Sequence, residues 1–270
     1  MCLLIVASRI DADFPLVVGA NRDERLDRKA IAVTVLRDSG PRILGGRDEV
    51  AGGTWLAVNE HGVVAALTNQ PSPDGRDDSK RSRGELPLAL AAHAHAGDAV
   101  QDFVDRFRPR DYNRAWLLVG DREFLYYIDM TGDDRADVAA LAPGVHVLGN
   151  YPLGQASVKV DFVRSYMDRH AGHGGAGLQR ALRGILADHT IPPGAAEEIR
   201  AHGGVTADGS PRPPQLAAAC VHTESYGTRS AAIVRVPASP GAGPSMEVAD
   251  GPSCVTPYTD ATACWSALPA

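Results

Sequence analysis

Cysteine is scarce in this chain. Among its 270 residues only four cysteines occur, and none of them forms a C-x-x-C pair: Cys2, Cys220, Cys254 and Cys264. So few cysteines exclude a disulfide-built scaffold and are typical of a protein in a reducing compartment. We therefore expect a cytoplasmic location.

Closely spaced metal ligands are also missing. The histidine pairs His93/His95 and His170/His173 lack the cysteine or carboxylate partners that zinc sites usually place nearby in the sequence. We interpret these histidines as helix-surface or loop residues. The sequence therefore predicts no metal site and no cofactor.

Basic residues are not in excess, and no apolar run is long. The chain has 27 Lys and Arg against 33 Asp and Glu, a net charge of -6. This balance argues against nucleic-acid binding and against electrostatic docking on an anionic membrane. The longest early apolar run, Leu3 to Ala7, is too short for a membrane span or a signal peptide.

Short apolar segments bounded by turn residues predict strands in three blocks. The expected strands cover residues 2–8, 16–23, 31–36, 54–58, 62–69, 114–121, 123–130, 144–150, 217–227, 230–236 and 246–251. We expect the segments 217–227 and 230–236 to pair as a hairpin. Glycines in the segment 45–53 are interpreted as turn residues.

Helical spacing of apolar residues predicts the remaining elements. The expected helices cover residues 85–96, 98–107, 158–170 and 177–189. Ser82 and Glu85 have the spacing of a capping box at the start of the first helix. The Gly- and Pro-rich segment 192–214 is expected to be mostly loop, and the tail from about residue 250 is expected to be irregular.

Strands and helices thus alternate in blocks. This grouping favours an α+β fold in which two antiparallel sheets pack face to face and helices cover their outer faces, an αββα sandwich. We expect one domain over residues 1–270, although a two-domain α+β protein gives a similar order.

Cys2 follows the initiator methionine directly. Removal of Met1 would leave a thiol and a free α-amine on the same residue. The amine, with an ordinary pKa of about 7.7–8.0, can accept the thiol proton at neutral pH, so no histidine base is needed. The alternative role of Cys2 is that of a small buried apolar residue.

Several motifs occur in order along the chain: GANRDER at 19–25, GGRDEVAGGTWLAV at 45–58, LTN ending at Asn69, SRGEL at 82–86, VLGNYPLG at 147–154 and GTRS at 227–230. Together with Met1-Cys2 they resemble the NRDE family, which includes the transport-and-Golgi-organisation-2 proteins. The resemblance implies the N-terminal-nucleophile (Ntn) hydrolase fold, shared with cysteine enzymes such as choloylglycine hydrolases and penicillin V acylases.

The same resemblance implies the catalytic residues. Cys2 is the expected nucleophile, Asp23 holds its α-ammonium group, and Asn69 and Asn150 donate to the oxyanion of a tetrahedral intermediate. Those enzymes carry an arginine at the position of Ala20, so Arg229 becomes the candidate for the missing positive charge.

Three further residues are candidates for binding: Asn21, Arg22 and Trp55. On a strand, Arg22 should point to the face opposite to Asn21 and Asp23. Alternatives are an ion pair between Arg22 and Glu24, core packing of Trp55, and a turn role for Asn69 and Asn150.

The expected function is hydrolysis or acyl transfer on a small amide or acyl compound through a thioester at Cys2. The alternative, also implied by the resemblance, is a protein that binds and carries haem or acyl-coenzyme A. In that case His61, His93 or His222 are the candidate haem ligands, although no Cys-Pro haem-binding pair occurs.

Overall fold

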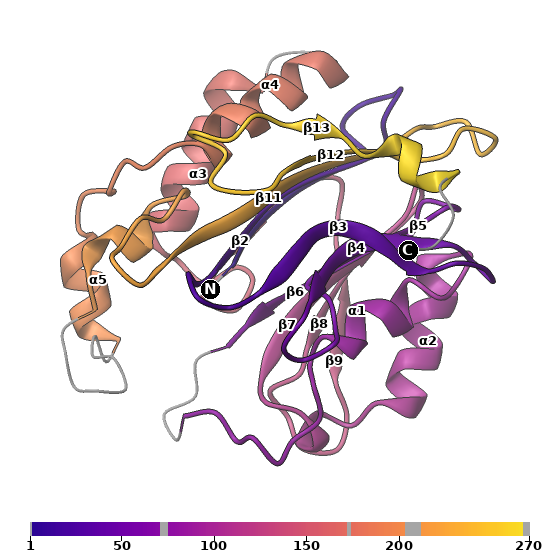
Figure 1. The fold of residues 1–270 in the computed structure, drawn as a ribbon, viewed down its shortest axis with the longest axis horizontal. Coiled ribbons are helices and arrows are strands. Elements are labelled where there is room, and N and C mark those ends of the chain that lie inside the picture. Colours follow the sequence, from indigo (N-terminus) through magenta and orange to yellow (C-terminus); the bar gives the residue numbers. More distant parts are fainter. Residues whose placement is uncertain (1, 71–74, 172–173, 203–211, 267–270) are drawn as a thin grey trace.

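The computed structural model describes residues 2–70, 75–171, 174–202 and 212–266. Two sheets, in which all paired strands are antiparallel, lie face to face in the described part of the chain (Figure 1). The first has the order β10 (Gly144–Leu148), β1 (Cys2–Ser8), β2 (Leu16–Arg25), β11 (Tyr226–Val236), β12 (Ser245–Ala249) and β13 (Thr259–Asp260). The second has the order β3 (Ala30–Arg37), β4 (Ile43–Asp48), β5 (Leu56–Asn59), β6 (Val64–Asn69), β7 (Ala115–Gly120), β8 (Leu125–Asp129) and β9 (Asp137–Ala140).

Helices cover the outer face of each sheet (Figure 1). The first sheet carries α3 (Val158–His170) and α4 (Gly175–Leu186), and the second carries α1 (Glu85–Leu90) and α2 (Ala96–Arg106). Apolar side chains fill the space between the sheets and the space under each helix pair. This four-layer arrangement confirms the predicted αββα sandwich. The remaining helical segments are α5 (Ala195–Ala201) and three 3₁₀ turns: η1 (Pro109–Asp111), η2 (Pro214–Ala217) and η3 (Thr262–Trp265).

Strand β1 is buried on both faces and runs inside the first sheet, between β10 and β2. Leu3 and Ile5 pack under the helices, whereas Leu4 and Val6 pack against the other sheet. A strand with two dry faces needs a continuous apolar run, and the sequence CLLIVA supplies it. The start of β1 is therefore held in a fixed place.

Several local predictions were wrong. Strand β4 contains Gly45 and Gly46, which we expected in turns; a Cβ on Gly45 would lie 2.1 Å from the Leu56 carbonyl oxygen, so glycine serves close strand approach there. Strand β9 was missed because all four of its residues are exposed and carry no apolar alternation.

The predicted helix 85–96 is also wrong in extent, because α1 ends at Leu90 and α2 begins at Ala96. Ser82 does not cap α1 with its side chain, and Glu85 contacts Arg81 and Tyr112 instead. The expected loop 192–214 contains helix α5, and its residues 203–211 lie outside the described residues.

The predicted hairpin of 217–227 with 230–236 is wrong. Ala217 ends η2, and the segment 218–225 forms no strand, apart from one antiparallel bridge of His222 with Gly227. Strand β11 starts at Tyr226 and pairs with β2 and β12. The tail beyond β12 is largely irregular, as predicted, apart from β13 and η3. No helix in the described ranges is long and apolar enough to cross a membrane.

Candidate functional site

The start of β1 meets the NRDE motif in the first sheet. The Cys2 backbone pairs with Arg22 on β2, and on the other side of β2 the start of β11 pairs with the motif, Thr228 opposite Asp23. The register of β11 shifts between Thr228 and Ser230, which places Arg229 in a bulge. Three strands from distant parts of the chain thus converge at one sheet end.

Asn21 is a structural tether on the helix-facing side of β2. Its buried Nδ2 donates to the carbonyl oxygens of Leu186 and Ala219, each at 2.9 Å. Leu186 is the last residue of α4, and Ala219 lies between η2 and β11. Asn21 therefore fixes the end of α4 and the segment before β11 against the site.

Asp23 lies on the same side, and its side chain has no exposed surface. Its Oδ1 accepts a hydrogen bond from the Thr228 hydroxyl at 2.7 Å, and its Oδ2 lies 3.8 Å from the Lys159 ammonium of α3. Burial raises the pKa of Asp23, and the charge of Lys159 opposes that shift. The carboxyl group is therefore a better proton acceptor than a carboxylate in water.

Lys159 was missed by the sequence analysis. A lysine in the first turn of an expected helix is ordinarily a solvated residue, yet this side chain is only 5% exposed because it is turned inward to Asp23. Thr228 was missed as well, since a threonine before a strand carries no special signal. The pairing of β11 with β2 reveals Thr228, and the packing of α3 on the sheet reveals Lys159.

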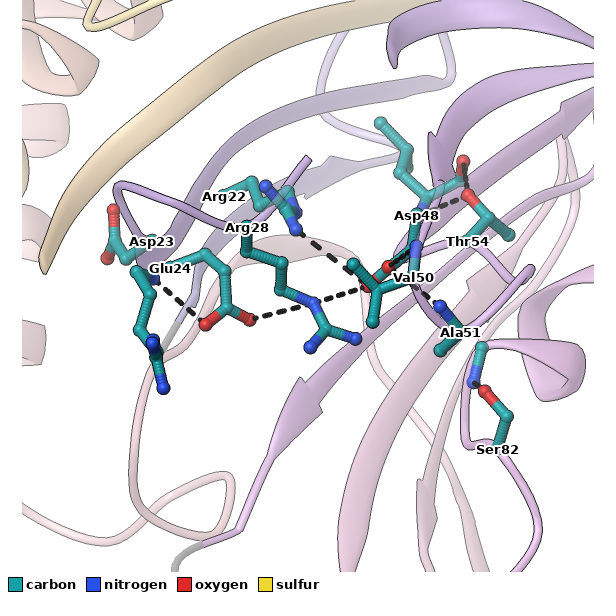
Figure 2. Close-up of polar contacts among 12 residues, drawn as sticks. Arg22, Asp23, Glu24, Arg28, Asp48, Val50, Ala51, Thr54 and Ser82 are labelled. Atoms are coloured by element: carbon teal, nitrogen blue, oxygen red, sulfur yellow. Dashed lines mark hydrogen bonds and ion pairs between the residues drawn. The ribbon is translucent and has the colours of Figure 1, made fainter. Parts of the chain in front are cut away.

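Arg22 points to the opposite face, as predicted (Figure 2). Its guanidinium lies over the Trp55 ring, 4.5 Å from the centroid, and its Nη2 is 3.8 Å from the Asp48 carboxylate. The alternative ion pair of Arg22 with Glu24 is wrong: Glu24 lies 3.8 Å from Arg28 instead. Trp55 is mostly buried and supports the arginine.

Asp48 is the centre of this second cluster (Figure 2). It accepts from Arg28 Nε at 2.8 Å and from the backbone N–H groups of Val50 and Ala51 at 2.9 and 3.1 Å. These bonds outweigh partial burial and lower the pKa of Asp48. The cluster shapes the loop that precedes Trp55.

Close glycine contacts hold the same loop. A Cβ on Gly46 would lie 2.0 Å from the Trp55 ring, and a Cβ on Gly53 would lie 2.5 Å from the Gly84 backbone. Thr54 also donates its backbone N–H to the Gly84 carbonyl at 2.9 Å. The glycines of the GGRDEVAGGTW and SRG motifs therefore allow direct backbone and ring packing beside the site.

Two of the clefts at this end of the molecule border Asp23 or Lys159. One, of about 100 Å³, is lined by Arg22, Asp23, Trp55 and Asn69 among others. The other, of about 210 Å³, is lined by Lys159, Asn150, Gln70 and Trp116 among others. The predicted residues Asn69 and Asn150 thus line neighbouring clefts, because the adjacent residues Asn69 and Gln70 each face a different one.

The larger of these clefts holds unsatisfied polar atoms. Trp116 Nε1, Gln70 Oε1 and Asn150 Oδ1 are buried, with no hydrogen-bond partner among the described residues. Such groups are rare in folded proteins and are typical of sites that bind a ligand or water. Trp116 and Gln70 are further residues that the sequence analysis did not identify.

The family profile described as Transport and Golgi organisation 2 matches residues 1–242. The chain belongs to this family. A Transport and Golgi organization protein 2 homolog from Bos taurus is 28% identical over 240 residues, 83% of this chain and 83% of that protein. A mouse homolog is 38% identical over 76 residues, 27% of each chain. The resemblance stated from the motifs is thereby confirmed.

One solved structure shows the fold class of this Transport and Golgi organisation 2 family member. The Caenorhabditis elegans ortholog of N-acylethanolamine-hydrolyzing acid amidase superposes with a TM-score of 0.52 at 15% identity, over 67% of this chain and 85% of that chain. At this identity the likeness concerns the fold alone. The predicted Ntn-hydrolase fold is thereby confirmed.

Proposed function

We propose that this family member is an N-terminal-cysteine amidohydrolase or acyltransferase for a small amide or acyl compound. The observation that carries the proposal is the convergence of the Cys2 backbone, at the start of the inner strand β1, with the buried Asp23, Thr228 and Lys159. A fully buried carboxyl group with a raised pKa beside a possible N-terminal amine is an arrangement suited to proton transfer.

In the proposed reaction, Met1 has been removed and the Cys2 thiol attacks the substrate carbonyl carbon. The thiol proton passes to the α-amine, which Asp23 orients, as the carbon–sulfur bond forms. The carbon–nitrogen bond then breaks, and the departing amine takes that proton, which leaves a thioester. Water, or an acceptor amine or thiol, attacks the thioester carbonyl carbon and loses a proton to the α-amine. The carbon–sulfur bond then breaks, the acyl product leaves as the acid or the new acyl compound, and the proton returns to the sulfur.

Oxyanion stabilisation is assigned to Asn69 and Asn150, which line neighbouring clefts. The Trp116 Nε1–H is a further donor for this role, because it is buried with no partner among the described residues. One such donor contributes about 3 kcal/mol to transition-state stability. Arg229 remains the candidate to lower the pKa of the Cys2 thiol.

An amide or acyl substrate is supported by the fold. A solved structure with this fold is named as a hydrolysing amidase, and the 210 Å³ cleft has Val160, Ile199 and Leu216 among its lining residues. A cleft with an apolar wall and few polar groups suits a short acyl chain.

The test is alkylation of tag-free protein with iodoacetamide near neutral pH, followed by mass spectrometry of the cysteine peptides. We expect the N-terminal peptide to begin at Cys2 with a free amine. It should react much faster than the peptide containing Cys264, which is half-buried and serves as the reference cysteine. Retention of Met1, or equal rates, would refute the proposed mechanism.

Substrate assays follow from that result. A panel of N-acyl amides of increasing acyl length should show release of amine by the wild type and none by Cys2→Ala. A Cys264→Ser variant is the matched control and should keep the wild-type rate. Acyl transfer would be recognised by a product that carries the acyl group on an added amine or thiol.

The carrier function is the second candidate, and one observation favours it. A cleft of about 530 Å³ next to Asn69 is lined by five arginines: Arg25, Arg76, Arg83, Arg114 and Arg212. Two of them, Arg25 and Arg76, are paired with Asp27 and Asp78. Such a wall suits the anionic part of a haem or acyl-coenzyme A ligand. Binding of either ligand by Cys2→Ala with wild-type affinity, without turnover by the wild type, would favour the carrier.

A further inference from the structure

A cluster of two cysteines and two histidines lies behind the candidate site. His189 follows α4, Cys220 and His222 precede β11, and Cys254 follows β12. One ligand atom from each of the four lies within 4.8 Å of the other three. Within the described ranges this is the only group of three or more His, Cys, Asp or Glu side chains that meets this condition. From this arrangement we propose that the chain binds one structural Zn²⁺ ion through His189, Cys220, His222 and Cys254.

The distances among Cys220, His222 and Cys254 fit a tetrahedral ion, and His189 is near enough to complete the set. With Zn–S of about 2.3 Å and Zn–N of about 2.0 Å, two sulfur ligands lie about 3.8 Å apart and a sulfur and a nitrogen about 3.5 Å apart. The Sγ atoms of Cys220 and Cys254 are 3.8 Å apart. His222 Nε2 lies 3.5 Å from the first and 3.2 Å from the second. His189 is exposed on the same side, with its ring 5.4 Å from that of His222.

The donor set selects the metal. Two thiolates and two imidazoles are a common ligand set of closed zinc sites, and no open position remains for a substrate. Each thiol gives up its proton as its sulfur binds the ion, so that two positive charges meet two negative ligands. We therefore assign a structural rather than a catalytic role.

Hydrogen bonds already hold the three segments together. Cys220 donates its backbone N–H to the Asp188 carbonyl at 2.8 Å, and the Ser253 hydroxyl donates to the Leu186 carbonyl at 2.9 Å. Asp188 directly precedes His189, and Ser253 directly precedes Cys254. The two bonds therefore fix the segments that carry three of the four proposed ligands. The ligands are thus positioned before any ion binds, which reduces the cost of ordering them.

The proposed ion would brace the site from behind. Residues on either side of Cys220 contact the NRDE strand: the Ala219 carbonyl accepts from Asn21, and the Val221 N–H donates to the Thr228 hydroxyl, which in turn binds Asp23. Loss of the ion should loosen these contacts without removing any of their atoms. The inference does not depend on the proposed reaction, since a carrier on the same fold would need the same brace.

The four proposed ligands do not form a compact sequence motif. Cys220 and His222 are two positions apart, but His189 lies 31 positions before Cys220 and Cys254 lies 34 positions after it. Only the fold brings them together.

Metal content tests the proposal. Tag-free protein, purified with a reducing agent and without chelator, should contain one zinc per chain by elemental analysis and native mass spectrometry. After chelation, added Co²⁺ should give the absorption of tetrahedral cobalt with thiolate ligands, and one equivalent of Zn²⁺ should abolish it. Cys220→Ser and Cys254→Ser should lose the zinc, whereas Cys264→Ser and Cys2→Ala should retain it.

A variant of the exposed His189 provides a second test in case the cysteine variants do not fold. His189→Gln should fold, as circular dichroism would show, and should bind Zn²⁺ at least about tenfold more weakly. Zinc should raise the melting temperature of the wild type and slow amide exchange at Val221 and Thr228. Three results would each overturn the proposal. The wild type could be purified without metal and fail to bind added Zn²⁺, Cys254→Ser could contain as much zinc as the wild type, or Cys220 and Cys254 could form a disulfide under reducing conditions.

Discussion

Two carboxylates beside one motif have opposite environments. Asp23 is fully buried, with one hydroxyl donor and a lysine 3.8 Å away, and its pKa is raised. Asp48 is partly exposed, accepts one arginine and two backbone donors, and its pKa is lowered. The two carboxylates lie on strands of different sheets, β2 and β4. Under the proposed function, the buried Asp23 takes part in the chemistry, whereas the Asp48 network stabilises the fold.

Asp23→Asn should give the largest effect. If Asp23 orients the α-amine, its loss should lower amide turnover by about 10²–10⁴-fold and slow alkylation of Cys2, because a neutral amide holds the α-ammonium group less strongly than a carboxylate does. Turnover and alkylation rates are compared with those of Asp48→Asn. If turnover and Cys2 alkylation fell equally in the two variants, Asp23 would have no special role in the chemistry.

Gly46→Ala should damage only the Asp48 side. The added methyl group would meet the Trp55 ring, which must shift and release the Arg22 guanidinium stacked on it. We expect a loss of about 1–3 kcal/mol in the free energy of unfolding. Denaturant unfolding measures this loss. Gly241→Ala is the control, since nothing lies within 4 Å of its added methyl group.

Asp48→Asn should destabilise the fold and spare the chemistry. It replaces a charged acceptor of Arg28 and of two backbone N–H groups, so we expect a loss of about 2 kcal/mol. Denaturant unfolding and Cys2 alkylation are measured on the same sample. Asp27→Asn removes a solvent-exposed ion pair with Arg25 and should leave the denaturant midpoint nearly unchanged, which makes it the control.

The smallest expected effect is a difference in pH dependence. Because the pKa of Asp48 is lowered below 3.8, its ionised form stabilises the fold above that pH, and this contribution is lost as the pH falls. Because the pKa of Asp23 is raised above 3.8, its ionisation costs stability as the pH rises.

The destabilisation by Asp48→Asn should therefore shrink at acidic pH, whereas Asp23→Asn should gain stability relative to the wild type as the pH rises. Unfolding curves at pH values on either side of 3.8 measure both trends. Parallel pH dependence in the two variants would contradict the assigned environments.

Much of the fold could be predicted because the decisive strands follow simple patterns. Strand β1 is a continuous apolar run, and β2 joins apolar residues to a charged end. Strand β4 could not be predicted, because Gly46 gives no strand signal until the Trp55 ring is known to lie against it. Strand β9 could not be predicted either, since its exposed residues lack alternation.

The candidate site was predictable only where residue type and motif position carry information. The motif placed Asn21, Arg22 and Asp23 together, and alternation gave the faces on which they lie. Lys159 and Trp116 could not be found, because burial of a helical lysine and of an indole N–H depends on packing between distant segments. The catalytic roles of Cys2, Asp23, Asn69, Asn150 and Arg229 remain predictions.

The two acceptors of Asn21 are backbone carbonyls, at Leu186 and Ala219. Because only Asn21 contributes its side chain to this contact, substitutions at position 21 should be tolerated less well than substitutions at its two partners. Position 21 needs a side chain of one length with two N–H donors, whereas positions 186 and 219 can change side chain freely as far as this contact is concerned. A saturation-mutagenesis map would therefore show one intolerant position facing two partners whose tolerance is set only by their own packing.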